Sequence, residues 1–173
     1  DWSSDVCSSD LPVLDGGRAV SSSRLRELIS AGDVAEAARL STAAYRITGT
    51  VVTGARRGAT LGFPTANLAE IATLLPGQGV YAAVAELPTG ARHAAAVHIG
   101  PNASFGCTDV SVEAHLVGYA GDLYGSRLDV DFLARLRDTR RFPTVEDLKS
   151  QLADDVAQAA RIAASHLTSA ARI

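Results

Sequence analysis

The residues best suited to chemistry lie in one glycine-rich stretch, residues 54–68, which reads GARRGATLGFPTANL. Its glycines allow tight turns and let the backbone approach a ligand closely, and successive free N–H groups in such a turn can bind an anion. Thr65 and Asn67 add neutral oxygen atoms of the kind that Mg²⁺ accepts beside phosphate oxygens. The stretch therefore predicts a loop that binds the phosphates of a nucleotide and their metal ion.

Two familiar phosphate-binding motifs do not fit this stretch. No Gly-Lys-Ser/Thr follows the glycines, as a Walker A loop requires, and neither the glycine spacing nor Pro64 suits a dinucleotide fingerprint. Composition alone leaves open a glycine-rich connection between strands that binds nothing. Arg56 and Arg57 could pair with phosphates, although arginines on a loop are more often simply solvated.

Glu113 is the candidate for acid–base chemistry. Residues 110–117 alternate, so Val112 and Ala114 point to one face of a strand and Glu113 to the other. A general base on a rigid strand keeps its carboxylate fixed relative to an acceptor hydroxyl. The alternative is a solvent-facing glutamate, which is the commoner situation for a strand carboxylate.

The histidines and cysteines give weaker signals. His93, His98 and His115 would form a metal site only if they converged with a carboxylate, and strand histidines on a solvated face are the simpler interpretation. Cys7 and Cys107 form no Cys-x-x-Cys pair, which argues against a zinc or redox motif.

Five motifs, in this order along the chain, resemble those of the riboflavin kinases. They are residues 62–68 (GFPTANL), 79–82 (GVYA), 99–102 (IGPN), 112–116 (VEAHL) and 121–125 (GDLYG). The resemblance covers about residues 45–160 and implies ATP-dependent phosphorylation of the riboflavin 5′-hydroxyl, with FMN and ADP as products and Mg²⁺ as the metal. A non-catalytic flavin- or nucleotide-binding barrel is the alternative.

The resemblance also implies roles for individual residues. Glu113 would accept the proton of the hydroxyl, and Thr65 and Asn67 would bind the metal and the phosphates. The remaining residues of the nucleotide and substrate site would be Gly54, Gly58, Gly62, Pro64 and, on a flap, Arg137. The chain departs from the family pattern at Ala55, Ala59, residues 102–105 (NASF) and residues 40–45, and none of these departures removes a proposed catalytic group.

Short strands separated by turns predict a mainly β protein with a closed antiparallel barrel, and the resemblance implies a six-stranded, Greek-key-like one. Strands are expected at residues 45–53, 80–87, 93–99 and 110–117, and from 128 toward 135. A long C-terminal helix is expected after its N-cap, Thr144. Its apolar stripe is expected to pack on the barrel and comprises Val145, Leu148, Leu152, Val156, Ala159, Ala163 and Leu167.

The N-terminal region divides into two parts. Residues 1–11 have no periodicity and are interpreted as a cloning or sequencing scar, or as a disordered linker. Residues 12–43 predict a small helical appendage, and they resemble the truncated end of the FMN adenylyltransferase domain that precedes the kinase domain in bifunctional bacterial FAD synthetases. There Ser22, Ser23 and Arg26 would contact ATP phosphates, although helix capping is the simpler role for serines. With the rest of that domain missing, no FAD synthesis is expected, and residues 44–173 form the barrel and its helix.

The amino-acid composition limits the kinds of partner that this protein is expected to bind. The 173 residues carry a net charge of −3 with 5% aromatic residues, which gives no basic footprint for nucleic acid and no polybasic membrane patch. No apolar run approaches the length of a membrane span and no secretory signal is visible. The expectation is a cytoplasmic protein whose partners are riboflavin/FMN and ATP/ADP, without nucleic acid or membrane.

Overall fold

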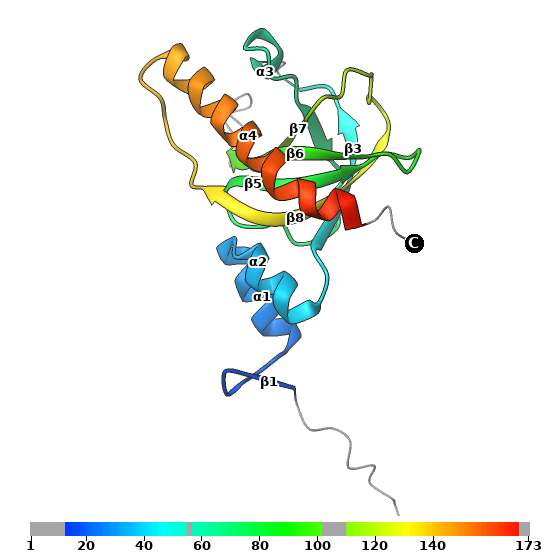
Figure 1. Ribbon diagram of the computed structural model, residues 1–173, viewed down its shortest axis with the longest axis vertical. Helices are drawn as coiled ribbons and strands as arrows, with labels where there is room; N and C mark the ends of the chain where they lie inside the picture. Colours follow the sequence, from blue (N-terminus) through cyan, green and yellow to red (C-terminus); the bar gives the residue numbers. More distant parts are fainter. Residues whose placement is uncertain (1–12, 55–56, 102–109, 170–173) are drawn as a thin grey trace, which may run out of the picture.

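A closed antiparallel β-barrel forms the body of the molecule in the computed structural model, which describes residues 13–54, 57–101 and 110–169 (Figure 1). The order of strands around the barrel is β3-β4-β7-β6-β5-β8. This confirms the predicted six-stranded barrel. The strands are β3 (Tyr45–Val52), β4 (Ala66–Ala69), β5 (Gly79–Glu86), β6 (Arg92–Pro101), β7 (Val110–Leu116) and β8 (Arg127–Arg137).

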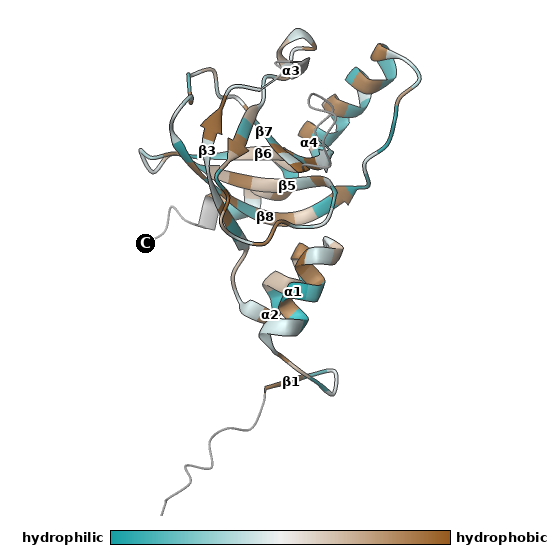
Figure 2. Cartoon of the chain, turned by 180° about the vertical axis from the view of Figure 1, so that it is seen from behind, coloured by the Kyte–Doolittle hydropathy of each residue, from teal (hydrophilic) through white to brown (hydrophobic). Residues whose placement is uncertain are grey.

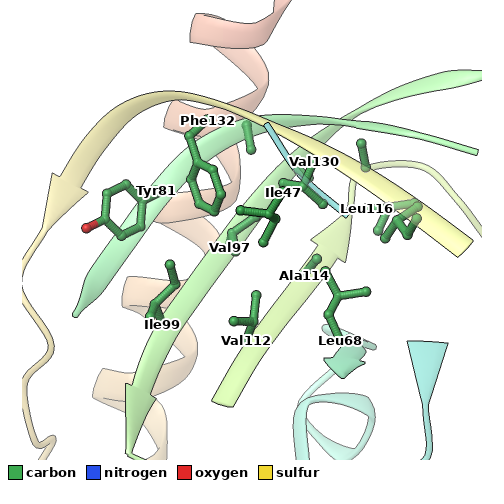
Figure 3. Packing of buried hydrophobic residues seen from close by; sticks show 14 of the residues in the cluster. Ile47, Leu68, Tyr81, Val97, Ile99, Val112, Ala114, Leu116, Val130 and Phe132 are labelled. Carbon is green, nitrogen blue, oxygen red and sulfur yellow. The ribbon is translucent and has the colours of Figure 1, made fainter. Parts of the chain in front are cut away.

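The interior of the barrel is a single apolar core to which every strand contributes (Figure 3). On β7 the alternation places Val112, Ala114 and Leu116 inside, as predicted, while Glu113 lies on the outer face. Large side chains fill the centre, among them Tyr81 and Phe132, whose rings meet edge to face at 5.3 Å between centroids. Because the inner face of β7 is filled by this core, only its outer face can contribute side chains to a ligand site.

Strands β5 and β6 are buried on both faces, because the helix α4 (Val145–Ser169) covers their outer face. Alanines on that face, such as Ala82 and Ala96, leave room for Ala159 of the helix to pack directly on the strands. Hydrophobic and hydrophilic residues alternate along α4, as expected for a helix with one covered side (Figure 2).

Only part of the predicted apolar stripe of α4 packs on the barrel. Ala159 and Ala163 are buried against it, but Leu148 and Leu152 line a cleft instead, and Val145 is 58% exposed. The predicted packing on the barrel is therefore wrong for the first turns of the helix. The predicted N-cap is correct, since the Thr144 hydroxyl accepts a hydrogen bond from the Asp147 N–H at 3.1 Å. The helix crosses the barrel obliquely, so its N-terminal end runs clear of the strands (Figure 1).

Two short helices close one end of the barrel (Figure 1). Helix α1 (Ser22–Ala31) begins after Ser21, whose hydroxyl accepts from the Arg24 N–H, and α2 (Val34–Ser41) begins after Asp33, whose carboxylate accepts from the Glu36 N–H. Capping was the simpler role expected for the serines of this region. A small hairpin, β1 (Leu14–Asp15) and β2 (Arg18–Ala19), precedes them and was not predicted.

The glycine-rich stretch contains two elements that the sequence did not predict. A single helical turn, α3 (Arg57–Thr60), follows Gly54, and strand β4 then pairs with β3 on one side and β7 on the other. The Pro-Thr-Ala-Asn run is therefore not only a loop, because its last two residues begin the strand that joins β3 to β7. Ala55, Arg56 and residues 102–109 lie outside the described residues.

Candidate active site

A cleft of about 450 Å³ opens between the outer face of the barrel and the first turns of α4. Helix α3 and the N-terminal end of α4 project from the same side of the barrel, and residues of both line the cleft (Figure 1). The walls are mostly apolar, with a few polar side chains at the barrel face, which is the usual character of a small-molecule site. Its lining includes Phe63, Thr65, His98, Glu113, Arg137 and Asp155.

Three polar residues of the cleft, His98, Glu113 and Arg137, belong to one row that crosses every strand of the barrel. Each member is the cross-strand partner of the next, so all members lie on the outer face and neighbouring side chains are about 5 Å apart. Glu113 stands in the middle, with Asn67 on one side and His98 on the other. The row runs Val52, Asn67, Glu113, His98, Val80, Arg137.

Three predicted site residues meet at one end of this row. The Thr65 hydroxyl lies 3.4 Å from Oε2 of Glu113 and donates to it, and Asn67 is the direct partner of Glu113 across β4 and β7. The Asn67 side chain lies against Gly54, where a Cβ atom would be only 2.1 Å from the Asn67 Nδ2. The absence of a side chain at Gly54 therefore leaves the space that the Asn67 side chain occupies.

A second, smaller cavity of about 250 Å³ adjoins this end. Pro64 and Thr65 form one wall, and the turn after β7 forms the other with Tyr119, Gly121 and Asp122. Thr65 lines both cavities. Two separate ligands could therefore meet at this residue.

The two histidines of the cleft have different surroundings. Nδ1 of His115 donates to the carbonyl oxygen of Pro64 at 2.8 Å, and its ring meets Phe63 edge to face, so it supports the glycine-rich stretch. His98 is half-buried, and this burial lowers its pKa, while the neighbouring Glu113 acts in the opposite direction and Arg137 in the same direction. Both histidines were interpreted from sequence as solvated strand residues, and both line the cleft.

Arg137, the last residue of β8, fastens α4 to the barrel. Its Nε and Nη2 atoms donate to the buried carboxylate of Asp155, at 2.7 Å for the closest contact. Gln151 donates a further hydrogen bond to the same carboxylate, and the guanidinium lies 5.6 Å from the ring centroid of Phe142. This cluster forms the far wall of the cleft.

The other predicted residues lie around the two cavities in different ways. Gly58 lies in α3 and lines the cleft. Gly62 follows α3 with a positive φ of 89° and lines neither cavity. Ser22 and Arg26 lie on α1, beside a separate hollow of about 350 Å³ next to Tyr45. Arg56, Cys7, Cys107 and residues 102–105 fall outside the described residues, as does the side chain of Arg57.

Several lining residues carried no signal in the sequence. Leu148 and Leu152 were assigned to the packing stripe of the helix, and His98 was interpreted as an isolated strand histidine. The strand register is the missing information, because it alone makes His98 the partner of Glu113. Residues 121–124, from the motif 121–125, line the second cavity.

This chain is similar to known proteins of one family. The Flavokinase family, described as riboflavin kinase, matches residues 41–163. Bifunctional riboflavin kinase/FMN adenylyltransferases match at 34% identity over 143 residues in Haemophilus influenzae and at 38% over 152 residues in Pseudomonas fluorescens. These matches cover 83% and 87% of this chain but 46% and 48% of the relatives, so the chain spans about half their length.

A solved structure, that of a macrolide-efflux protein from Streptococcus pneumoniae, has the same fold. It superposes with a TM-score of 0.79 at 34% identity, over 87% of this chain and 49% of that one. In the described part of the present chain, no helix combines the length and apolar character needed to span a membrane. The match of the Flavokinase family over most of the barrel and α4 establishes that this chain belongs to the riboflavin kinase family.

Proposed function

We propose that this chain transfers the γ-phosphoryl group of ATP to the 5′-hydroxyl of riboflavin, which gives FMN and ADP. The observation that carries the proposal is the position of Glu113, between the Thr65–Asn67 end of the row and the apolar cleft. Membership of the riboflavin kinase family supports the choice of substrate and reaction. The proposal concerns the barrel and its helix.

The two cavities suggest how the substrates are arranged. The larger cleft has the apolar walls and the size that a flat tricyclic flavin ring requires. The smaller cavity, next to Pro64 and Thr65, would receive the nucleotide. Since Thr65 lines both, the phosphates and the acceptor hydroxyl would meet beside Glu113.

The reaction requires one proton acceptor. The 5′-oxygen of riboflavin attacks the γ-phosphorus, a new O–P bond forms, and the bond from that phosphorus to the β-phosphate bridging oxygen breaks. The hydroxyl proton passes to the Glu113 carboxylate, and ADP leaves with the bridging oxygen. Because most of the catalysis in phosphoryl transfer comes from positioning and charge stabilisation, the rigid strand under Glu113 is as important as its basicity.

The donor set beside Glu113 fits Mg²⁺ bound mainly through phosphates. Within the described residues, no group of three or more His, Cys, Asp or Glu side chains could hold a metal by itself. Thr65 and Asn67 instead offer neutral oxygens next to the Glu113 carboxylate, and Mg²⁺ commonly keeps few protein ligands and completes its shell with phosphates and water. We propose that Thr65 and Asn67 hold this ion, which would neutralise charge on the transferring phosphoryl group.

The experiment is to incubate the purified chain with riboflavin, ATP and Mg²⁺ and to identify the products by mass. FMN and ADP should form in equal amounts, and neither should form when the metal is chelated. Binding of riboflavin without formation of FMN would favour the alternative, a non-catalytic flavin-binding barrel, and would reject the proposed reaction.

A further inference from the structure

His98 is a polar member of the row that crosses the barrel, and the proposed reaction gives it no role. It is the cross-strand partner of Glu113 on one side and of Val80 on the other, and it lines the cleft. Thr65 and Asn67 lie on the opposite side of Glu113. An acceptor that presents its terminal hydroxyl to Glu113, with the phosphates on the Thr65 side, must therefore extend the rest of its chain across His98.

The His98 ring occupies space that the absence of a side chain at Gly100 leaves free. It lies over Gly100, where a Cβ atom would be 2.7 Å from both Cε1 and Nε2 of the ring, so any other residue at position 100 would displace it. The same Cβ atom would lie 3.5 Å from Cγ2 of Thr139. No hydrogen bond from the described part of the chain engages the ring. As far as the described residues go, both nitrogens can therefore hydrogen-bond a molecule in the cleft.

The charge state of His98 suits a neutral polyol. Burial lowers its pKa, and of the charged groups that face it, Arg137 on β8 lowers the pKa further while Glu113 on β7 raises it. A neutral imidazole carries one hydrogen-bond donor and one acceptor. A hydroxyl group, which can donate and accept, is the complementary partner.

We propose that His98 is a specificity-determining residue that hydrogen-bonds a secondary hydroxyl of the polyol chain of the acceptor flavin. The inference rests on the proposed function for the identity of the acceptor, and it adds which part of the acceptor this chain recognises. His98 would favour a polyhydroxylated side chain over a plain alkyl alcohol of the same length.

The test is a double comparison of protein and ligand. Riboflavin is compared with the flavin whose N10 chain is an ω-hydroxypentyl group, which keeps the ring and the terminal hydroxyl but lacks the secondary hydroxyls. The dissociation constant of each is measured by flavin fluorescence for the parent chain and for His98→Phe, which keeps an aromatic ring but no hydrogen-bonding atom. His166→Phe, an exposed position on α4, is the matched control.

The parent and the control should bind riboflavin about 10-fold more tightly than the analogue, the effect of one lost hydrogen bond. His98→Phe should bind the two flavins alike, and His98→Asn should restore part of the preference. If His98→Phe does not fold, His98→Ala gives the same comparison without added bulk. A His98 variant that keeps the parental preference, or that loses affinity equally for both flavins, would overturn the inference.

Formation of FMN by the parent is followed in parallel, so that the two proposals can fail separately. Riboflavin preference without FMN would reject the kinase activity and retain the role of His98. A parent chain that binds neither flavin would reject both.

Discussion

Asn67 lies against a residue that has no side chain, and this contact makes its position testable. The free space over Gly54 is what allows the Asn67 side chain to lie beside Glu113, because a Cβ atom on residue 54 would overlap the Asn67 amide. A substitution at Gly54 should therefore act on the site through Asn67. Gly54 and Asn67 are therefore expected to affect the site together, since the position of the Asn67 side chain depends on the glycine.

Gly54→Ala should raise the KM for MgATP or lower turnover, and Asn67→Ala should do the same while the barrel stays folded. The double variant should be little worse than Asn67→Ala alone, because the alanine at position 54 has no amide left to displace. The four proteins of this cycle are compared in FMN formation over a titration of MgATP. Additive effects would show that Gly54 acts independently of Asn67, and unchanged kinetics in Asn67→Ala would remove its proposed role.

Residue alternation predicted the outward direction of Glu113 correctly, since it needs only local backbone geometry. The neighbours of Glu113 could not be predicted in the same way. His98 is adjacent to it only because β6 pairs with β7 in one register, and a slip of one residue would place His98 on the other face. The roles assigned to Glu113, Thr65 and Asn67 stay predictions until they are measured.

At the scale of elements, α4 has two parts with different tasks. Its later turns pack small residues on β5 and β6, and its first turns form a wall of the cleft. The two parts meet near Asp155, which is 2% exposed and pairs with Arg137. This pair sets the position of the wall relative to the barrel.

Asp155→Ala should destabilise the protein by about 3 kcal/mol, the lower end of the cost of breaking a buried ion pair, because the Arg137 side chain keeps some contact with water. Riboflavin affinity should fall as well, since the wall loses its anchor. Asp154→Ala, at the exposed neighbouring position, is the matched control. Both are measured by denaturant unfolding and flavin fluorescence, and equal stability of the two variants would contradict the anchoring role.

Sequence periodicity identified α4 and its cap but not its division, because the same apolar stripe serves both for packing and for lining a cavity. Strand β4 was missed for another reason. Its four residues begin at the end of a glycine-rich stretch that also contains Pro64, and they are held as a strand by partners on both sides and not by their own propensity.

At the scale of the whole molecule, the N-terminal helices are continuous with the barrel. Val34 of α2 is fully buried and belongs to the same core as Tyr81 and Phe132. Arg135 of β8 also donates to backbone carbonyl groups of Ala31 and Gln78. The origin of residues 12–43 as the end of an adenylyltransferase domain stays a prediction, but the packing of α1 and α2 makes these helices part of the folded unit.

Val34→Ala should lower the free energy of unfolding by about 2 kcal/mol, the cost of removing buried methyl groups from a filled core. Helix loss and barrel unfolding should occur in one transition, followed by circular dichroism and by the fluorescence of bound flavin. Val145→Ala makes the same change at a position that is 58% exposed and should be nearly neutral. Separate transitions for helices and barrel would show that α1 and α2 are an independent appendage.

The closed barrel follows from the sequence only with the help of family resemblance. Local patterns indicated most of its strands, including β5 and β6. They could not give the order β3-β4-β7-β6-β5-β8, because that order depends on contacts between distant parts of the chain. The cleft depends on this order, since it lies where β6, β7 and α4 meet.

The central claim is that Glu113 accepts the proton of the riboflavin 5′-hydroxyl, and Glu113→Gln tests it most directly. The substitution keeps the size of the side chain and removes the basic carboxylate. Thermal midpoint, riboflavin affinity and the rate of FMN formation are measured for this variant, for the parent and for Glu146→Gln, which makes the same change at an exposed position of α4.

FMN formation by Glu113→Gln should fall on the order of 10²- to 10⁴-fold, the usual loss for a positioned acid–base group, while riboflavin affinity changes far less. Stability should stay within about 0.5 kcal/mol, as for most surface substitutions, and Glu146→Gln should match the parent throughout. A folded Glu113→Gln protein that forms FMN at the parental rate would contradict the account.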